Sequence, residues 1–232
     1  MGLRLIQKHD ETDPSQRQVY YLSTSDYIQH KHAPGSEGAN EFYSAIDKII
    51  TALDEAGAVI GLTADHGMNE KVRYDGSPRV VMLEDVLKEA GIPARVVLPI
   101  TDPYVVHHGS LGSYATVYVN DKKDTERAMA ALSEHDGVYT VMGKAKAALG
   151  LELPADRIGD FIICGDENTV LGKSAEYHDL NQVPALRSHG GLMEQTVPMF
   201  FNRPLKMDYA RKLTKGKARN LHLFDFLLNG MA

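Results

Sequence analysis

Apolar residues form two different patterns along this chain, continuous runs and helical repeats, and each pattern predicts a different kind of element. The segment 58–68, AVIGLTADHGM, begins with an apolar run and ends on Asp65-His66-Gly67. Such a run predicts a strand that is buried on both faces. Over 37–56 the apolar residues instead recur every three or four positions, which predicts an amphipathic helix with Ser36 as its N-cap.

A second apolar run, over 19–23, predicts a strand before this helix. Strand, helix and strand in succession predict two parallel strands joined by a right-handed crossover. The polar residues that follow each strand would then lie at one edge of the sheet, where open α/β sheets bind ligands. Residues 1–17 are polar and predict a linker, with at most a short strand at 3–6.

From residue 92 onward, short strands of period two alternate with short helices. We interpret 92–153 as a small α+β insertion that caps the sheet edge, and 1–91 with 154–232 as the core of an α/β domain. The insertion is predicted to hold strands at 95–98, 114–119 and 138–142 and helices at 124–134 and 144–149. The second part of the core is predicted to hold strands at 158–164 and 196–201 and a helix at 221–228; another helix is predicted at 79–90.

Composition narrows the class of protein. The 232 residues carry a net charge of −6, which gives no reason to expect nucleic acid as a partner. No apolar run approaches the roughly 20 residues of a membrane span, and the N-terminus lacks the apolar core of a signal peptide. The single cysteine, Cys164, excludes an internal disulfide. These features together predict a cytoplasmic enzyme.

Asp65 and His66 are the first candidates for chemistry, because they stand directly after a predicted buried strand. A carboxylate and a neutral imidazole suit Zn²⁺ or a similar divalent ion, and Gly67 lets the backbone turn away from the site. The alternative is a simple turn, with the aspartate as a cap and the histidine on the surface.

Two further clusters have the same character. Asp26 and His30 are four residues apart, so a helical turn would put both side chains on one face, where they could hold one ion. His189 lies in the irregular segment 188–191, next to two glycines. Each cluster alone is also compatible with a cap and a surface histidine.

The motifs STSDYIQHKHAPG, LTADHGMN and RSHGG resemble the metal-ligand motifs of the alkaline phosphatase superfamily, in its nucleotide pyrophosphatase/phosphodiesterase-like branch. With ITDPYVVHHGSLGS and GDFIICGDENTVLG, they resemble the phosphonoacetate hydrolases of that branch. The resemblance extends from about Val19 to the end of the chain. It implies an α/β fold in which a mixed or parallel sheet is flanked by helices.

The resemblance also implies a metal site. It implies that Asp26, His30 and His189 hold one Zn²⁺ and that Asp65 and His66 contribute to a second. Two zinc ions would clamp an in-line displacement at phosphorus. The implied reaction breaks the carbon–phosphorus bond of phosphonoacetate, a small-molecule phosphonate, and gives acetate and phosphate.

One part of the family pattern has no counterpart here. Members of the superfamily supply a further aspartate ligand and a threonine or serine nucleophile from a βα unit that precedes these motifs. Thr24 and Thr63 lie inside motifs whose counterparts are not nucleophiles, so we assign no catalytic residue. We expect the chain to correspond to the C-terminal portion of the enzyme, without the N-terminal βα units and with an unpaired edge or apolar face.

Three hypotheses follow from this departure. The chain is part of a working hydrolase whose other half lies on another chain or in further polypeptide; or it is a truncated, inactive metal-binding remnant; or it is a sibling phosphodiesterase or phosphonate monoester hydrolase. The expected protein partner is a complementing N-terminal half or a second copy in a homodimer. His108 and Arg187 are candidates for substrate binding. His108 fits better as part of an exposed loop, whereas Arg187 fits a surface ion pair equally well. His178, in the polar segment 165–188, is predicted to be exposed.

Overall fold

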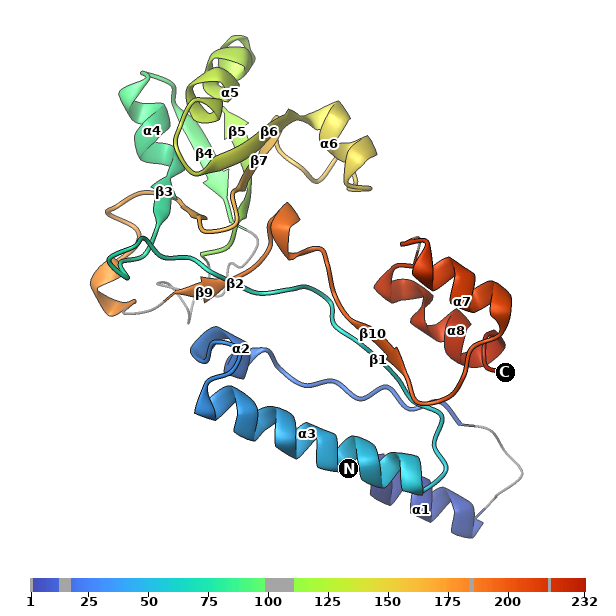
Figure 1. The fold of residues 1–232 in the computed structure, drawn as a ribbon. Coiled ribbons are helices and arrows are strands. Elements are labelled where there is room, and N and C mark those ends of the chain that lie inside the picture. The colour runs from blue at the N-terminus through green and yellow to red at the C-terminus, as the bar shows by residue number, and fades with distance from the viewer. Residues whose placement is uncertain (1, 13–17, 99–110, 184–185, 217) are drawn as a thin grey trace. The chain divides into compact units, whose positions relative to one another are not determined.

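The computed structural model describes the chain except for residues 1, 13–17, 99–110, 184–185 and 217 (Figure 1). The chain divides into two compact units. The first unit comprises 1–65 and 197–232, and the second comprises 66–196. Within the described ranges, every helix is too short or too polar to cross a membrane.

The first unit is mainly helical and contains one short ladder. Its strands β1 (Gly61–Thr63) and β10 (Met199–Phe201) pair antiparallel, with Leu62 opposite Phe200. Its helices are α1 (Gly2–Thr12), α2 (Tyr27–Lys31), α3 (Glu37–Glu55), α7 (Met207–Thr214), α8 (Leu223–Asn229) and the 3₁₀ helix η4 (Asn220–His222).

Helix α3 confirms the helix predicted after Ser36. The Ser36 side chain accepts a hydrogen bond from the Ala39 N–H at 3.4 Å, which satisfies one of the donors left open at the helix start. The chain leaves the helix through Gly57, whose φ of 83° lies in the left-handed region that favours glycine.

A network of hydrogen bonds and one ion pair joins the end of α3 to the β1–β10 ladder. Asn202 accepts a hydrogen bond from the Ile60 N–H at 2.7 Å and donates one to Asp54 at 2.8 Å. Arg203 forms an ion pair with Asp54 at 2.5 Å. Hydrogen bonds from Arg203 and Asn202 hold the pKa of Asp54 below its ordinary value.

Several predictions for the N-terminal third are wrong. Residues 2–12 form a helix in place of a linker or strand, because Leu3 and Ile6 are three residues apart and share a half-buried face of α1, which contacts α3. Segment 19–23 is not a strand, and its side chains Val19 and Tyr21 are 62% and 78% exposed.

The predicted parallel pair joined by a crossover is therefore not formed. Strand β1 covers only Gly61–Thr63, is half-buried rather than buried on both faces, and pairs antiparallel with β10. An apolar run becomes a buried strand only where neighbouring strands and helices cover it, and among the described residues β10 alone pairs with β1.

Large apolar side chains are exposed in the first unit, as expected for an uncovered apolar face. The buried hydrophobic residues described there are Ala39, Leu53 and Phe226. The exposed ones are Leu5, Val19, Tyr21, Leu22, Tyr27, Tyr43, Ile49, Val59, Phe200, Met207, Leu221, Phe224 and Leu228. Most of the buried hydrophobic residues among those described belong to the second unit.

The second unit is built on a four-stranded antiparallel sheet in the order β4-β5-β7-β6 (Figure 1). These strands confirm the predicted ones to within three residues at each end. Their bounds are β4 (Ala94–Val97), β5 (Tyr114–Val119), β6 (Val138–Gly143) and β7 (Phe161–Gly165).

Strand β7 is buried along its whole length and supplies both faces of the sheet. Phe161 and Ile163 pack in one core cluster with residues of α4 (Leu83–Glu89) and α5 (Thr125–Ser133). Ile162 and Cys164 pack in a second cluster with α6 (Lys144–Gly150). This alternation is the strand period of two, with both faces covered by helices.

Short ladders and single-turn helices surround this sheet. Strand β3 (Val80–Met82) pairs parallel with β8 (Val170–Gly172), and β2 (Asn69–Glu70) pairs antiparallel with β9 (Arg187–Ser188). The 3₁₀ helices are η1 (Lys122–Asp124), η2 (Leu180–Gln182) and η3 (Leu192–Glu194).

Strand β3 corrects the helix predicted over 79–90, which begins only at Leu83. Its partner β8 lies in the polar segment 165–188, for which no strand was predicted. Because Val170 and Leu171 are fully buried, the β-branched residues of β3 gain more from this ladder than from an additional helical turn.

The second unit extends beyond the predicted insertion 92–153. It also includes β7, because this strand lies between β5 and β6 in the four-stranded sheet. Whether 92–153 is inserted into a larger α/β core stays a prediction, as does the assignment of 1–91 and 154–232 to that core.

The thiol of Cys164 offers a test of the position of β7. Cys164 is 1% exposed, and burial raises its pKa to about 12. Since the thiolate is the reactive form, we expect no reaction of the folded protein with Ellman's reagent at pH 8, and complete reaction after unfolding in guanidinium. Rapid modification of the folded protein would contradict the buried position of β7.

Candidate metal centre

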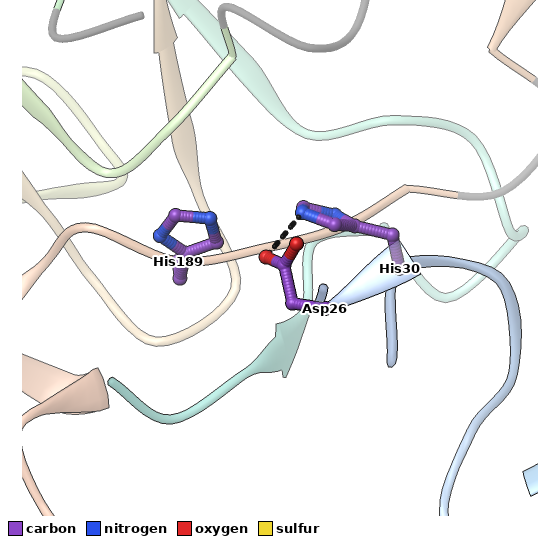
Figure 2. A group of neighbouring side chains, drawn as sticks. All are labelled: Asp26, His30 and His189. Atoms are coloured by element: carbon purple, nitrogen blue, oxygen red, sulfur yellow. Dashed lines mark ion pairs between the residues drawn. The ribbon is translucent and has the colours of Figure 1, made fainter. Parts of the chain in front are cut away.

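Asp26 and His30 form an ion pair in the first unit, with 3.0 Å between Asp26 Oδ2 and His30 Nε2 (Figure 2). Helix α2 creates this contact, because Asp26 directly precedes it and His30 lies one turn further along the same face. The His30 N–H also donates to the Asp26 carbonyl at 3.1 Å. The predicted shared face is confirmed, and the Asp26 side chain makes no capping hydrogen bond to α2.

The exposure of this pair suits a ligand site. The side chains of Asp26 and His30 are 42% and 21% exposed, so an ion can reach them from solvent. A carboxylate oxygen and an imidazole nitrogen already face each other, and both are donor types that zinc prefers. The chemistry of this donor pair therefore fits a divalent metal ion.

His66 and His189 lie together in the second unit. Their rings stack with centroids 3.6 Å apart and planes 9° from parallel. His66 is the first residue of this unit, and His189 directly follows β9. The sequence assigned them to different clusters, and the structure brings them into contact.

The backbone around His189 is fixed on both sides. The His189 carbonyl accepts a hydrogen bond from the buried Ser113 N–H at 2.8 Å. Gly190 has a φ of 97°, in the left-handed region, which turns the chain directly after the histidine. The position of the imidazole is therefore set by main-chain geometry as well as by ring stacking.

The ligand set implied by the resemblance is divided between the two units. Asp26, His30 and Asp65 belong to the first unit, and His66 and His189 belong to the second. Asp65 is exposed at the end of β1. Figure 2 draws Asp26, His30 and His189, each of which offers one ligand atom. Their assembly around common ions is a proposal.

Of the two candidate substrate-binding residues, the structure describes only Arg187. His108 lies outside the described residues. Arg187 is half-buried in β9, where it stands opposite Glu70. Its role in substrate binding stays a prediction.

His178 corrects the prediction of an exposed loop histidine, because it is only 2% exposed. Its Nε2 accepts a hydrogen bond from the Lys173 N–H at 3.1 Å, which closes the loop after β8. Lys71 and Glu194 were not singled out from the sequence at all. Their side chains are 0% and 1% exposed and form an ion pair at 2.8 Å, an arrangement rare for either residue type.

The chain belongs to the type I phosphodiesterase / nucleotide pyrophosphatase family, whose sequence model matches residues 3–192. The matched residues include Asp26, His30, Asp65, His66 and His189. The predicted membership of the phosphodiesterase-like branch is confirmed.

The predicted resemblance to phosphonoacetate hydrolase is also confirmed. The enzyme from Sinorhizobium meliloti 1021, solved in complex with phosphonoformate and with phosphonoacetate, is 44% identical, with TM-scores of 0.85 and 0.86. The match covers 100% of this chain but 54% of that enzyme, so the chain spans about half the length of this relative.

A more distant structure shares the fold. Murine ectonucleotide pyrophosphatase / phosphodiesterase 5 is 19% identical with a TM-score of 0.57, and the match covers 87% of this chain and 51% of that protein. The mixed α/β class predicted from the sequence is thereby confirmed.

Gly190→Ala tests the main-chain geometry beside His189. An alanine at a φ of 97° is strained, so we expect the free energy of unfolding to fall by about 1–3 kcal/mol in urea titrations. Gly150→Ala is the matched control, because a Cβ there meets nothing within 4 Å and the φ is not positive. Equal stability of the two variants would contradict the described turn.

Proposed function

We propose that this chain takes part in the zinc-dependent hydrolysis of the carbon–phosphorus bond of phosphonoacetate to acetate and phosphate. The observation that carries the proposal is the 44% identity over the whole chain to a phosphonoacetate hydrolase solved with phosphonoacetate bound. The Asp26–His30 pair supports it, because its donor atoms already face each other at 3.0 Å.

In this proposal Asp26, His30 and His189 hold one zinc ion, and Asp65 and His66 contribute ligands to a second. Two such ions about 4 Å apart supply charge stabilisation on both sides of an in-line displacement at phosphorus. The task of this chain is to hold and orient the ions. Arg187 is proposed to bind a carboxylate or phosphonate group of the substrate, because a guanidinium pairs with either in a bidentate manner, and His108 is proposed to assist it.

No residue of this chain is proposed as the nucleophile. We propose that the nucleophile and a further aspartate ligand come from a complementing N-terminal half, either in a longer polypeptide or on a second chain. The 54% coverage of the relative and the exposed apolar side chains of the first unit support this partner. A homodimer is the other partner that the resemblance suggested. The cytoplasmic location stays a prediction.

Two other functions have specific support. The description of the matching family favours a phosphodiesterase, which would share the metal ligands and differ in the substrate. The small core of the first unit favours an inactive metal-binding remnant of the enzyme. Both differ from the proposal in an observable way.

Metal analysis combined with a phosphate assay separates these functions. We expect the purified chain to bind zinc. We expect phosphate release from phosphonoacetate when the N-terminal half of the Sinorhizobium enzyme is added. Zinc binding without release under either condition would favour the remnant. Cleavage of bis-p-nitrophenyl phosphate without phosphate release from phosphonoacetate would favour the phosphodiesterase.

His189→Ala tests the ligand assignment. Loss of one of three ligands should weaken zinc binding by at least about 100-fold, since even residues that only support a ligand typically contribute 10–100-fold. Competition with a chromophoric chelator measures the affinity, and circular dichroism checks the fold. The control is His135→Ala, which removes an exposed histidine of the same unit. Unchanged affinity in His189→Ala would refute the assignment.

A further inference from the structure

A buried acid, Glu194, joins the two segments of the second unit that carry histidines. Its backbone carbonyl accepts a hydrogen bond from the Gly67 N–H at 2.7 Å, directly after His66. Its Oε2 accepts one from the Gly191 N–H at 2.8 Å, two residues after His189. One residue thus contacts the backbone beside both imidazoles.

The other carboxylate oxygen of Glu194 contacts the segment after His66 again. Its Oε1 accepts hydrogen bonds from Asn69 Nδ2 at 2.7 Å and from Lys71 Nζ at 2.8 Å. Three donors therefore converge on one carboxylate, and two of them come from the segment that follows His66. The main-chain and side-chain contacts together hold 66–71 against 189–194.

Lys71 balances the charge of this buried acid. Its side chain is 0% exposed, and its ammonium also donates to the Glu167 carbonyl at 2.7 Å. Burial lowers the pKa of Lys71, while the Glu194 carboxylate opposes this shift. A buried ion pair of this kind is seldom more stabilising than apolar side chains of equal volume.

The backbone of Gly67 packs closely against Glu194. A Cβ on Gly67 would lie 3.2 Å from the Glu194 carbonyl oxygen and 3.4 Å from the Glu194 Cα. This close approach, together with the hydrogen bonds of the Glu194 carboxylate, fixes the position of segment 66–71 against segment 189–194.

We propose that Glu194, with its charge balanced by Lys71, is a positioning residue that holds His66 and His189 in their stacked arrangement for metal binding. The part of this inference that concerns metal rests on the proposed function. The part that concerns ring geometry holds for the metal-free protein.

Glu194→Gln isolates the role of the carboxylate at nearly constant size. The amide has one oxygen in place of two, so it cannot accept from Gly191, Asn69 and Lys71 together. One of the three donors is then opposed by the amide N–H₂, so at least one of the contacts that fix the segments carrying His66 and His189 is lost.

The matched control is Asp160→Asn in the same unit. Asp160 is 13% exposed and pairs with Lys122 at 2.6 Å, so this variant also removes a carboxylate from an ion pair. It makes none of the contacts described for the two segments with histidines. If the imidazole signals and zinc affinity respond to a general loss of stability, both variants should change them. If Glu194 positions the histidines, only Glu194→Gln should change them.

The test uses the full chain and two measurements. The first is the nuclear magnetic resonance spectrum of the imidazole groups without metal, which reports ring stacking. The second is the affinity for zinc. For Glu194→Gln we expect shifted His66 and His189 signals and zinc binding weakened by about 10–100-fold, whereas Asp160→Asn should change neither.

The outcomes distinguish this inference from the proposed function. Unchanged imidazole signals and zinc affinity within twofold of the original protein in Glu194→Gln would overturn the positioning role, while the proposed function stands. Shifted signals in a protein that never binds zinc would support the positioning role and refute the metal proposal. If Glu194→Gln does not fold, Asn69→Ala removes one donor only and should shift the same signals less.

Discussion

The hydrogen bonds of Ser113 connect the buried core of the second unit to the segment that carries His189. Ser113 is fully buried directly before β5. Its N–H donates to the His189 carbonyl at 2.8 Å, its carbonyl accepts from the Gly165 N–H at 2.9 Å, and its hydroxyl donates to the Thr169 carbonyl at 2.6 Å. These hydrogen bonds attach the segment of His189 to β7, the most buried strand of the sheet. Precise ligand geometry requires that the residues of a site be held on a rigid scaffold of this kind.

The two units differ in how far their sequences provide a core. The second unit covers both faces of its sheet with helices, whereas the described part of the first unit buries few hydrophobic residues and exposes many. Contiguous apolar surface of this kind, where it occurs, marks an interaction site. In the proposed function, a complementing N-terminal half covers the exposed apolar side chains of the first unit.

The sequence pattern was sufficient to predict an element where the residues that determine it lie within or next to that element. Ser36 and the apolar repeat after it predicted α3, and the four-residue spacing of Asp26 and His30 predicted their contact. Strands β4, β5 and β6 followed from alternation, because the sheet that buries them lies within one stretch of sequence.

Predictions failed where burial depends on partners distant in sequence. The run at 19–23 has strand composition but no ladder, and β3 replaced a helical turn because β8 pairs with it. The buried states of Lys71 and His178 have no local signal, since a lysine or histidine in a polar segment is usually exposed. The stacking of His66 on His189 likewise required the three-dimensional arrangement.

The central claim is the proposal that Asp26, His30 and His189 bind one metal ion together. Anomalous diffraction at the zinc edge from crystals grown with zinc tests it most directly. The account predicts a strong anomalous peak within bonding distance, about 2.0–2.2 Å, of a carboxylate oxygen of Asp26 and an imidazole nitrogen of each histidine. The absence of an anomalous peak at these three residues would contradict it, whether or not zinc binds at Asp65 and His66.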